Sequence, residues 1–153
     1  MFSKSQASAI KHSFWTAFGK YMSLQPGPWG EKINWINYKT GMRHLNFKME
    51  ALPRGAYIAI EIAHPDPGIQ ELMFEQFKEF KNILNGYLDE DWEWTLHGQD
   101  ENYKVVSTIR KTLPDVSIYK QEDWPKLISF FKPRIIALDA FWNDVRDGFQ
   151  LFK

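Results

Sequence analysis

The chain has 153 residues, balances 19 Lys and Arg against 19 Asp and Glu, and contains no cysteine. The length fits one ordinary domain, and the missing cysteines exclude a disulfide framework, a thiolate zinc site and a cysteine nucleophile. The neutral balance of charge argues against strong non-specific binding to nucleic acid, which draws on an excess of Lys and Arg.

A capping box predicts the first helix, over about residues 4–22. Ser3 and Gln6 can each satisfy a free backbone amide of its first turn. Apolar residues then recur at helical spacing, namely Ile10, Phe14, Ala17, Phe18 and Tyr21. The segment 25–30, rich in Pro and Gly, ends this helix.

Three strands are expected next, over residues 33–38, 44–51 and 56–63. The second alternates apolar and polar residues, which predicts one buried face and one polar face. Turns at Thr40-Gly41 and at residues 53–55 imply antiparallel hairpins. If the second hairpin is centred on its turn, the large aliphatic residues of both strands share one face.

Asp66 and Pro67 suit the cap and first position of a second helix. Its apolar stripe, at spacings of three and four, predicts one helix from there to Leu88. A fourth strand follows around residues 92–96, a fifth over 103–110, and a short edge strand over 116–119.

The last helix begins near Asp123, with Pro125 in its first turn, and Pro133 predicts a kink or a division into two short helices. Its apolar residues have heptad spacing: Ile128, Phe131, Ile135, Leu138, Trp142, Val145, Phe149 and Phe152. This seam has two interpretations. It is either the core-facing side of a packed helix, or the interface of a two-fold homodimer formed through the C-terminal helix.

The order α-βββ-α-ββ(β)-α predicts a single α+β domain over residues 1–153. We expect a mainly antiparallel sheet of five to six strands, packed with an N-terminal helix and two long helices. The N-terminus lacks the apolar core of a signal peptide, and no run approaches the ~18 apolar residues of a membrane helix. These features predict a cytoplasmic protein without membrane association.

Three segments resemble an uncharacterised bacterial family, a domain of unknown function: residues 13–22 (SFWTAFGKYM), 35–41 (WINYKTG) and 129–139 (SFFKPRIIALD). The similarity spans the whole chain. Related members occur C-terminal to restriction-endonuclease-like domains, so the resemblance implies work linked to nucleic acid. It implies no catalytic residues.

Restriction-endonuclease-like cores have the element order helix, three strands, helix, strand. The first two thirds of the order predicted here are similar. Their third strand needs Glu-x-Lys or Asp-x-Lys, where carboxylates hold a metal and the lysine helps position water. Here that strand has Glu61-Ile62-Ala63, so alanine occupies the lysine position. A nuclease with a displaced site, using Glu50, Glu61 and His44 as metal ligands, is the alternative left open.

The polar face of the second and third strands is the best candidate site. The expected register places there His44, Asn46, Lys48, Glu50, Tyr57 and Glu61. Asn46 would lie opposite Glu61, with Lys48 as its diagonal neighbour. Such a group could hold a cation or a phosphate, and the alternative is a solvated face with a Lys48–Glu61 ion pair.

The four histidines show no metal-binding spacing, and strand alternation aims His44 and His64 at opposite faces, so no metal and no cofactor are predicted. An acidic cluster, residues 89–93, could bind a cation or a basic partner. Basic and aromatic residues near the last helix are candidate nucleic-acid contacts: Arg110, Lys111, Trp124, Lys126, Lys132 and Arg134.

No Gly-rich phosphate loop, nucleophile elbow or dinucleotide fingerprint occurs in the sequence. The leading hypothesis is therefore a non-catalytic binding module that acts with nucleic acid or a nuclease partner. A protein-interaction or dimerisation domain is the third possibility.

Overall fold

The computed structural model describes residues 2–153, and within this range it contains four α-helices and one sheet of four antiparallel strands. The elements are α1 Lys4–Met22, β1 Leu45–Ala51, β2 Gly55–Ile62, α2 Pro67–Glu79, α3 Lys81–Leu88, β3 Glu93–Gln99, β4 Val105–Pro114 and α4 Trp124–Val145. Short 3-10 helices, η1 Gln121–Asp123 and η2 Arg146–Phe152, flank α4. The α+β class is confirmed, but the prediction of five to six strands is wrong.

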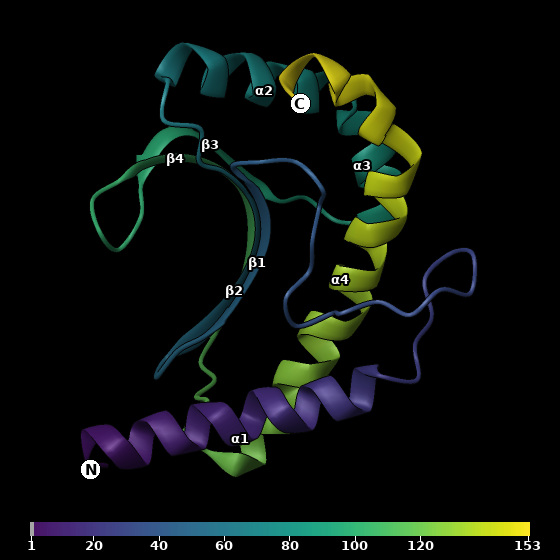
Figure 1. The fold of residues 1–153 in the computed structure, drawn as a ribbon. Coiled ribbons are helices and arrows are strands. Elements are labelled where there is room, and N and C mark those ends of the chain that lie inside the picture. Colours follow the sequence, from purple (N-terminus) through teal and green to yellow (C-terminus); the bar gives the residue numbers. More distant parts are fainter. Residues whose placement is uncertain (1) are drawn as a thin grey trace.

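The strands lie in the order β1-β2-β4-β3. The β1–β2 register matches the sequence prediction, with Leu45 opposite Ile62, Phe47 opposite Ile60 and Asn46 opposite Glu61. Figure 1 shows that the sheet curves, with α4 beside its convex side and the β3–β4 loop on the other side. The convex side is the apolar one, because α2 and α4 both pack against the strands.

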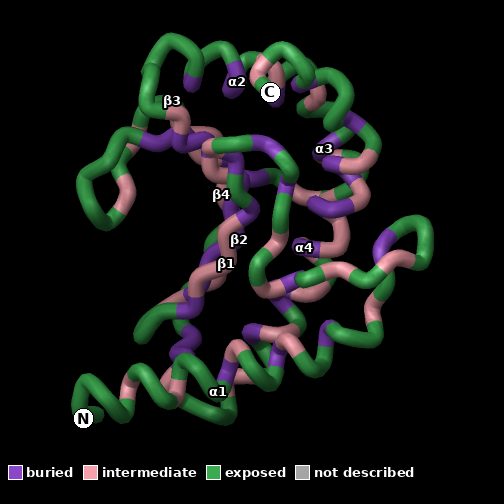
Figure 2. The backbone as a smooth tube through the Cα atoms, in the orientation of Figure 1, coloured by how far each residue is buried: buried purple, intermediate pink, exposed green. Residues whose placement is uncertain are grey.

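Helix α1 has the predicted bounds and the predicted capping box. The Ser3 hydroxyl accepts from the Gln6 backbone amide at 3.2 Å, and the Gln6 side chain accepts from the Ser3 amide at 2.8 Å. Most of the helix surface is exposed (Figure 2), and the buried side chains are Phe14, Phe18 and Met22. The hydroxyl therefore stabilises an end of the helix that has little packing.

Ser3→Ala is expected to lower the free energy of unfolding by about 1 kcal/mol, because an N-terminal backbone amide loses its acceptor. Ser8→Ala is the matched control, since Ser8 is exposed within the same helix and alanine there favours helix. Urea unfolding followed by circular dichroism measures both. Equal stabilities of the two variants would contradict the capping role.

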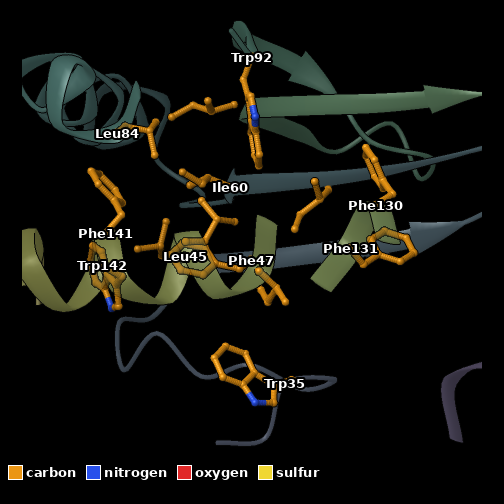
Figure 3. Packing of buried hydrophobic residues seen from close by; sticks show 14 of the residues in the cluster. Trp35, Leu45, Phe47, Ile60, Leu84, Trp92, Phe130, Phe131, Phe141 and Trp142 are labelled. Atoms are coloured by element: carbon orange, nitrogen blue, oxygen red, sulfur yellow. The ribbon is translucent and has the colours of Figure 1, made fainter. Parts of the chain in front are cut away.

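The core lies between the convex side of the sheet and the helices. Figure 3 shows aromatic and aliphatic side chains from α3, α4, the strands and the 23–44 segment meeting there. The heptad seam of the last helix belongs to this core, because its members Phe131, Ile135, Leu138, Trp142, Val145 and Phe149 are buried. Those side chains are thus occupied within one chain. No helix in residues 2–153 is long and apolar enough to cross a membrane.

Two predicted strands do not form. Residues 33–38 are irregular because Trp35 and Tyr38 turn onto the core, and the Asn34 side chain accepts from the Asn37 amide at 3.1 Å, which favours a turn. Residues 116–119 form a turn in which the Ser117 amide donates to the Asp123 carboxylate at 2.9 Å. Aromatic and β-branched residues predicted strands here, but they fill the core instead.

Of the two long helices that were expected, one divides and the other does not. The helix expected from Pro67 to Leu88 breaks at Phe80, where α2 ends and α3 begins. Helix α4 runs through Pro133 without dividing, because buried Phe131 and Ile135 on either side pack into the core. That packing outweighs the roughly 3 kcal/mol that a proline costs inside a helix.

Candidate binding face

The concave side of the sheet carries polar side chains from all four strands. Strand alternation and the register place on it Asn46, Lys48 and Glu50 of β1, Tyr57, Ala59 and Glu61 of β2, Thr108, Arg110 and Thr112 of β4, and Glu93 and Thr95 of β3. We call this set the concave face. One row across it runs Lys48, Ala59, Arg110 and Glu93. The two cations of that row are separated only by the small side chain of Ala59.

The predicted polar cluster forms at one end of this face. The Lys48 ammonium lies 3.7 Å from the Glu61 carboxylate, and the Asn46 amide donates to Glu61 at 3.3 Å. Lys48 also pairs with Glu101 at 3.2 Å. Glu101 lies between β3 and β4, and the sequence did not indicate it because loop conformation is not periodic. Lys48 is therefore already neutralised within the chain.

Glu50 and Tyr57 lie opposite each other at the other end of the concave face. Glu50 is half-buried and has no ion-pair partner among residues 2–153. Burial raises the pKa of Glu50, against the opposing effect of Lys48. Burial likewise raises the pKa of Tyr57. This end favours neutral or cationic contacts over further carboxylates.

Arg110 occupies the centre of the concave face. Its guanidinium stacks over the Tyr57 ring at 3.8 Å, an arrangement that cation–π attraction stabilises. No carboxylate lies within 4.0 Å of this cation, and its buried Nε has no hydrogen-bond partner in the described chain. Arg110 was expected among the nucleic-acid contacts, and the alternation Thr108, Arg110, Thr112 could have placed it on the polar face.

The other predicted nucleic-acid contacts do not gather around Arg110. Lys111 points to the opposite side of the sheet and lies 3.9 Å from Glu90. Arg134 forms a bidentate pair with Glu90 at 2.8 and 2.9 Å. Of the acidic cluster after α3, Glu90 thus finds its basic partners inside the chain. Burial alone would raise the pKa of Glu90, but hydrogen bonds from Arg134 and Trp92 hold it below its usual range.

The remaining three candidates are spread over α4. The indole of Trp124 donates to the Ile118 carbonyl at 2.7 Å, so it closes a turn. The Lys132 ammonium lies 4.7 Å from the centre of the Tyr21 ring. Lys126 is exposed. These residues form no common surface with Arg110.

His44 and His64 lie together, contrary to the prediction that they face opposite sides. Their ring centroids are 5.1 Å apart. His44 has a φ of 65°, a left-handed conformation that turns its side chain out of the strand alternation. Partial burial and the neighbouring His64 lower the pKa of His44.

The carboxylates proposed for a displaced nuclease site do not converge. Glu50 and Glu61 are four residues apart in the register, which is about 13 Å along the strands. No group of three or more His, Cys, Asp or Glu within residues 2–153 could hold a metal ion. Within residues 2–153, only two strands precede α2. The structure therefore does not have the order helix, three strands, helix that was expected by comparison with restriction-endonuclease-like cores.

A second polar cluster joins two segments that the resemblance had singled out. The Tyr38 hydroxyl donates to the carboxylate of Asp139 on α4, and the Asn143 amide donates to the same oxygen at 3.1 Å. Asp139 is 2% exposed and borders an open cavity of about 480 Å³. Burial raises the pKa of Asp139, against the hydrogen bond from Tyr38. This cluster fixes the irregular 23–44 segment onto α4.

The fold and these two clusters define an α+β domain with a polar concave sheet face. A family described as a domain of unknown function, DUF4268, matches residues 10–146, and the chain belongs to this family. No curated protein and no solved structure gives a match.

Proposed function

We propose that this domain is a non-catalytic binding module that holds single-stranded nucleic acid on its concave face. The observation that supports this most directly is the unpartnered Arg110 guanidinium stacked on Tyr57. A buried N–H without an acceptor costs about 1–3 kcal/mol. A phosphate group would supply acceptors to the two terminal nitrogens of the guanidinium, which are not among the buried unsatisfied atoms, and their planar geometry suits bidentate recognition.

The neighbours of Arg110 favour a nucleic-acid strand as the ligand. Thr108 and Thr112 flank it along β4 and offer hydroxyl groups to phosphate, sugar or base edges. A guanidinium plane can also stack on a base. The nuclease context implied by the resemblance agrees with this ligand.

Fluorescence polarisation with labelled single- and double-stranded DNA and RNA tests this function. We expect Arg110→Gln to weaken single-strand binding by roughly ten- to a hundredfold, because hydrogen bonds to a charged group contribute about 1.5–3 kcal/mol. Lys111→Gln is the matched control: it removes the same charge from the same strand, but on the opposite side and beside Glu90. Arg110→Lys should be intermediate, since it keeps the charge and loses the fork.

The outcomes separate the alternatives. Binding should weaken as salt rises, and Arg110→Gln should remain folded, because it loses the contact with the Tyr57 ring but no ion pair among the described residues. Equal binding by Arg110→Gln and Lys111→Gln, or no binding at low salt, would reject the concave face as the site. Shortening of the labelled strand with magnesium, lost in Glu61→Ala, would instead favour the nuclease.

A further inference from the structure

The outer edge of β1 is open. Strand β1 lies at the end of the sheet and pairs only with β2. The His44 carbonyl accepts from the Ala63 amide, and the Leu52 amide donates to the Gly55 carbonyl, both at 2.8 Å. Because hydrogen-bonded pairs alternate along an antiparallel ladder, the even-numbered residues of β1 face β2.

The odd-numbered residues therefore direct their backbone groups outward. The 23–44 segment covers the first of them: the Leu45 amide donates to the Met42 carbonyl at 3.4 Å, and the Leu45 carbonyl accepts from the Thr40 hydroxyl at 2.9 Å. The backbone groups of Phe47, Met49 and Ala51 have no such partner in the described chain. A groove of about 740 Å³ lies beside β1 and residues 36–44, which leaves room for another strand.

We propose that β1 pairs with β1 of a second copy of this chain, antiparallel and centred on Met49. In this register Met49 pairs with its own copy, and Phe47 pairs with Ala51 of the second copy. Each pair exchanges two backbone hydrogen bonds. This register pairs the outward backbone groups of Phe47, Met49 and Ala51. It does not involve Leu45, whose backbone groups the 23–44 segment already covers.

The charges on β1 select this register. Centring the pair on Met49 places Lys48 opposite Glu50 of the second copy, twice by symmetry. Centring it on Lys48 would oppose two lysines, and centring it on Glu50 would oppose two glutamates, both unfavourable. Glu50, which has no ion-pair partner among residues 2–153 of its own chain, gains one.

This pairing has a structural consequence for the concave face. Two four-stranded sheets would become one continuous sheet, with both concave faces on the same side. The inference does not depend on Arg110 or on nucleic acid, so it can fail or succeed independently of the proposed function. The interface is also distinct from the last helix, whose seam lies in the core.

Sedimentation velocity of the full chain over a range of concentrations tests the pairing. We expect a wild-type dimer and a Met49→Pro monomer, because proline removes an outward N–H while leaving the β1–β2 bonds intact. Met49→Ala is the matched control, since it shortens the same side chain and keeps the N–H, and it should remain a dimer. A monomeric wild type, or a dimer that persists in folded Met49→Pro, would overturn the proposal.

Charge exchange provides the second test, which also decides the case in which Met49→Pro does not fold. Glu50→Lys should raise the dimer dissociation constant about tenfold or more, because two opposite-charge pairs become like-charge pairs. The double variant Lys48→Glu/Glu50→Lys should restore the dimer. Glu50→Lys with unchanged association would overturn the register.

Discussion

Phe149→Ala is expected to lower the free energy of unfolding by about 3–5 kcal/mol, as truncation of a fully buried phenylalanine does in other cores. The ring has no exposed surface. It contacts the rings of Phe77 at 4.5 Å and Trp142 at 5.2 Å between centroids, so it joins η2, α2 and α4. Since domains are typically stable by 5–15 kcal/mol, this variant should be near its unfolding threshold.

Urea unfolding measured by tryptophan fluorescence gives this difference. Leu151→Ala is the control, because Leu151 lies two residues away on the same 3-10 helix and is 86% exposed. Its stability should change by less than about 0.5 kcal/mol. A Phe149→Ala loss as small as that of the control would mean that η2 is not packed on α2.

Phe149→Asp is unsuitable for testing whether the heptad seam of the last helix forms a dimer. The variant would place a charge in the core, so loss of a dimer would report unfolding and not an interface. The β1 edge variants avoid this problem, because Met49 lies at the rim of the sheet and is not fully buried.

Asp139→Ala is expected to lower the free energy of unfolding by about 1–3 kcal/mol, because the partly buried donors of Tyr38 and Asn143 lose their carboxylate acceptor. Asp139→Asn should cost less, since its amide oxygen can still accept from the Tyr38 hydroxyl. Thermal or urea unfolding of the three proteins at one pH measures the difference. Equal losses in the two variants would show that the hydrogen bond is unimportant.

The pH dependence of the Asp139→Asn effect has a definite sign. Burial raises the pKa of Asp139 above its ordinary 3.8 in the folded state. The wild-type carboxyl therefore contributes most at low pH, where it is protonated in both states, and loses that contribution as pH rises through the folded pKa. Asn does not titrate, so Asp139→Asn should be most costly below pH ~4 and less costly at neutral pH.

Unfolding free energies at acidic and neutral pH, compared between wild type and Asp139→Asn, test this sign. Asp147→Asn is the control, because it makes the same chemical change at an exposed position. A cost of Asp139→Asn that grows toward neutral pH would contradict a pKa of Asp139 raised by burial.

The sequence by itself determined the parts of this protein that depend on local interactions. The Ser3–Gln6 capping box and the Asp66 cap involve residues within three positions of each other. The β1–β2 hairpin follows from period-two alternation and a short turn, which together allow only one register that buries all the large aliphatic side chains. For that reason the Lys48–Glu61 pair was also predictable.

Tertiary structure alone decided the rest. The Tyr38–Asp139 hydrogen bond joins residues that are 101 positions apart, and Arg110 meets Tyr57 only because β4 lies beside β2. Core packing turned the expected strand at residues 33–38 into an irregular segment and split the helix at Phe80. Such contacts depend on how distant elements fill a shared volume, and no local pattern in the chain encodes that.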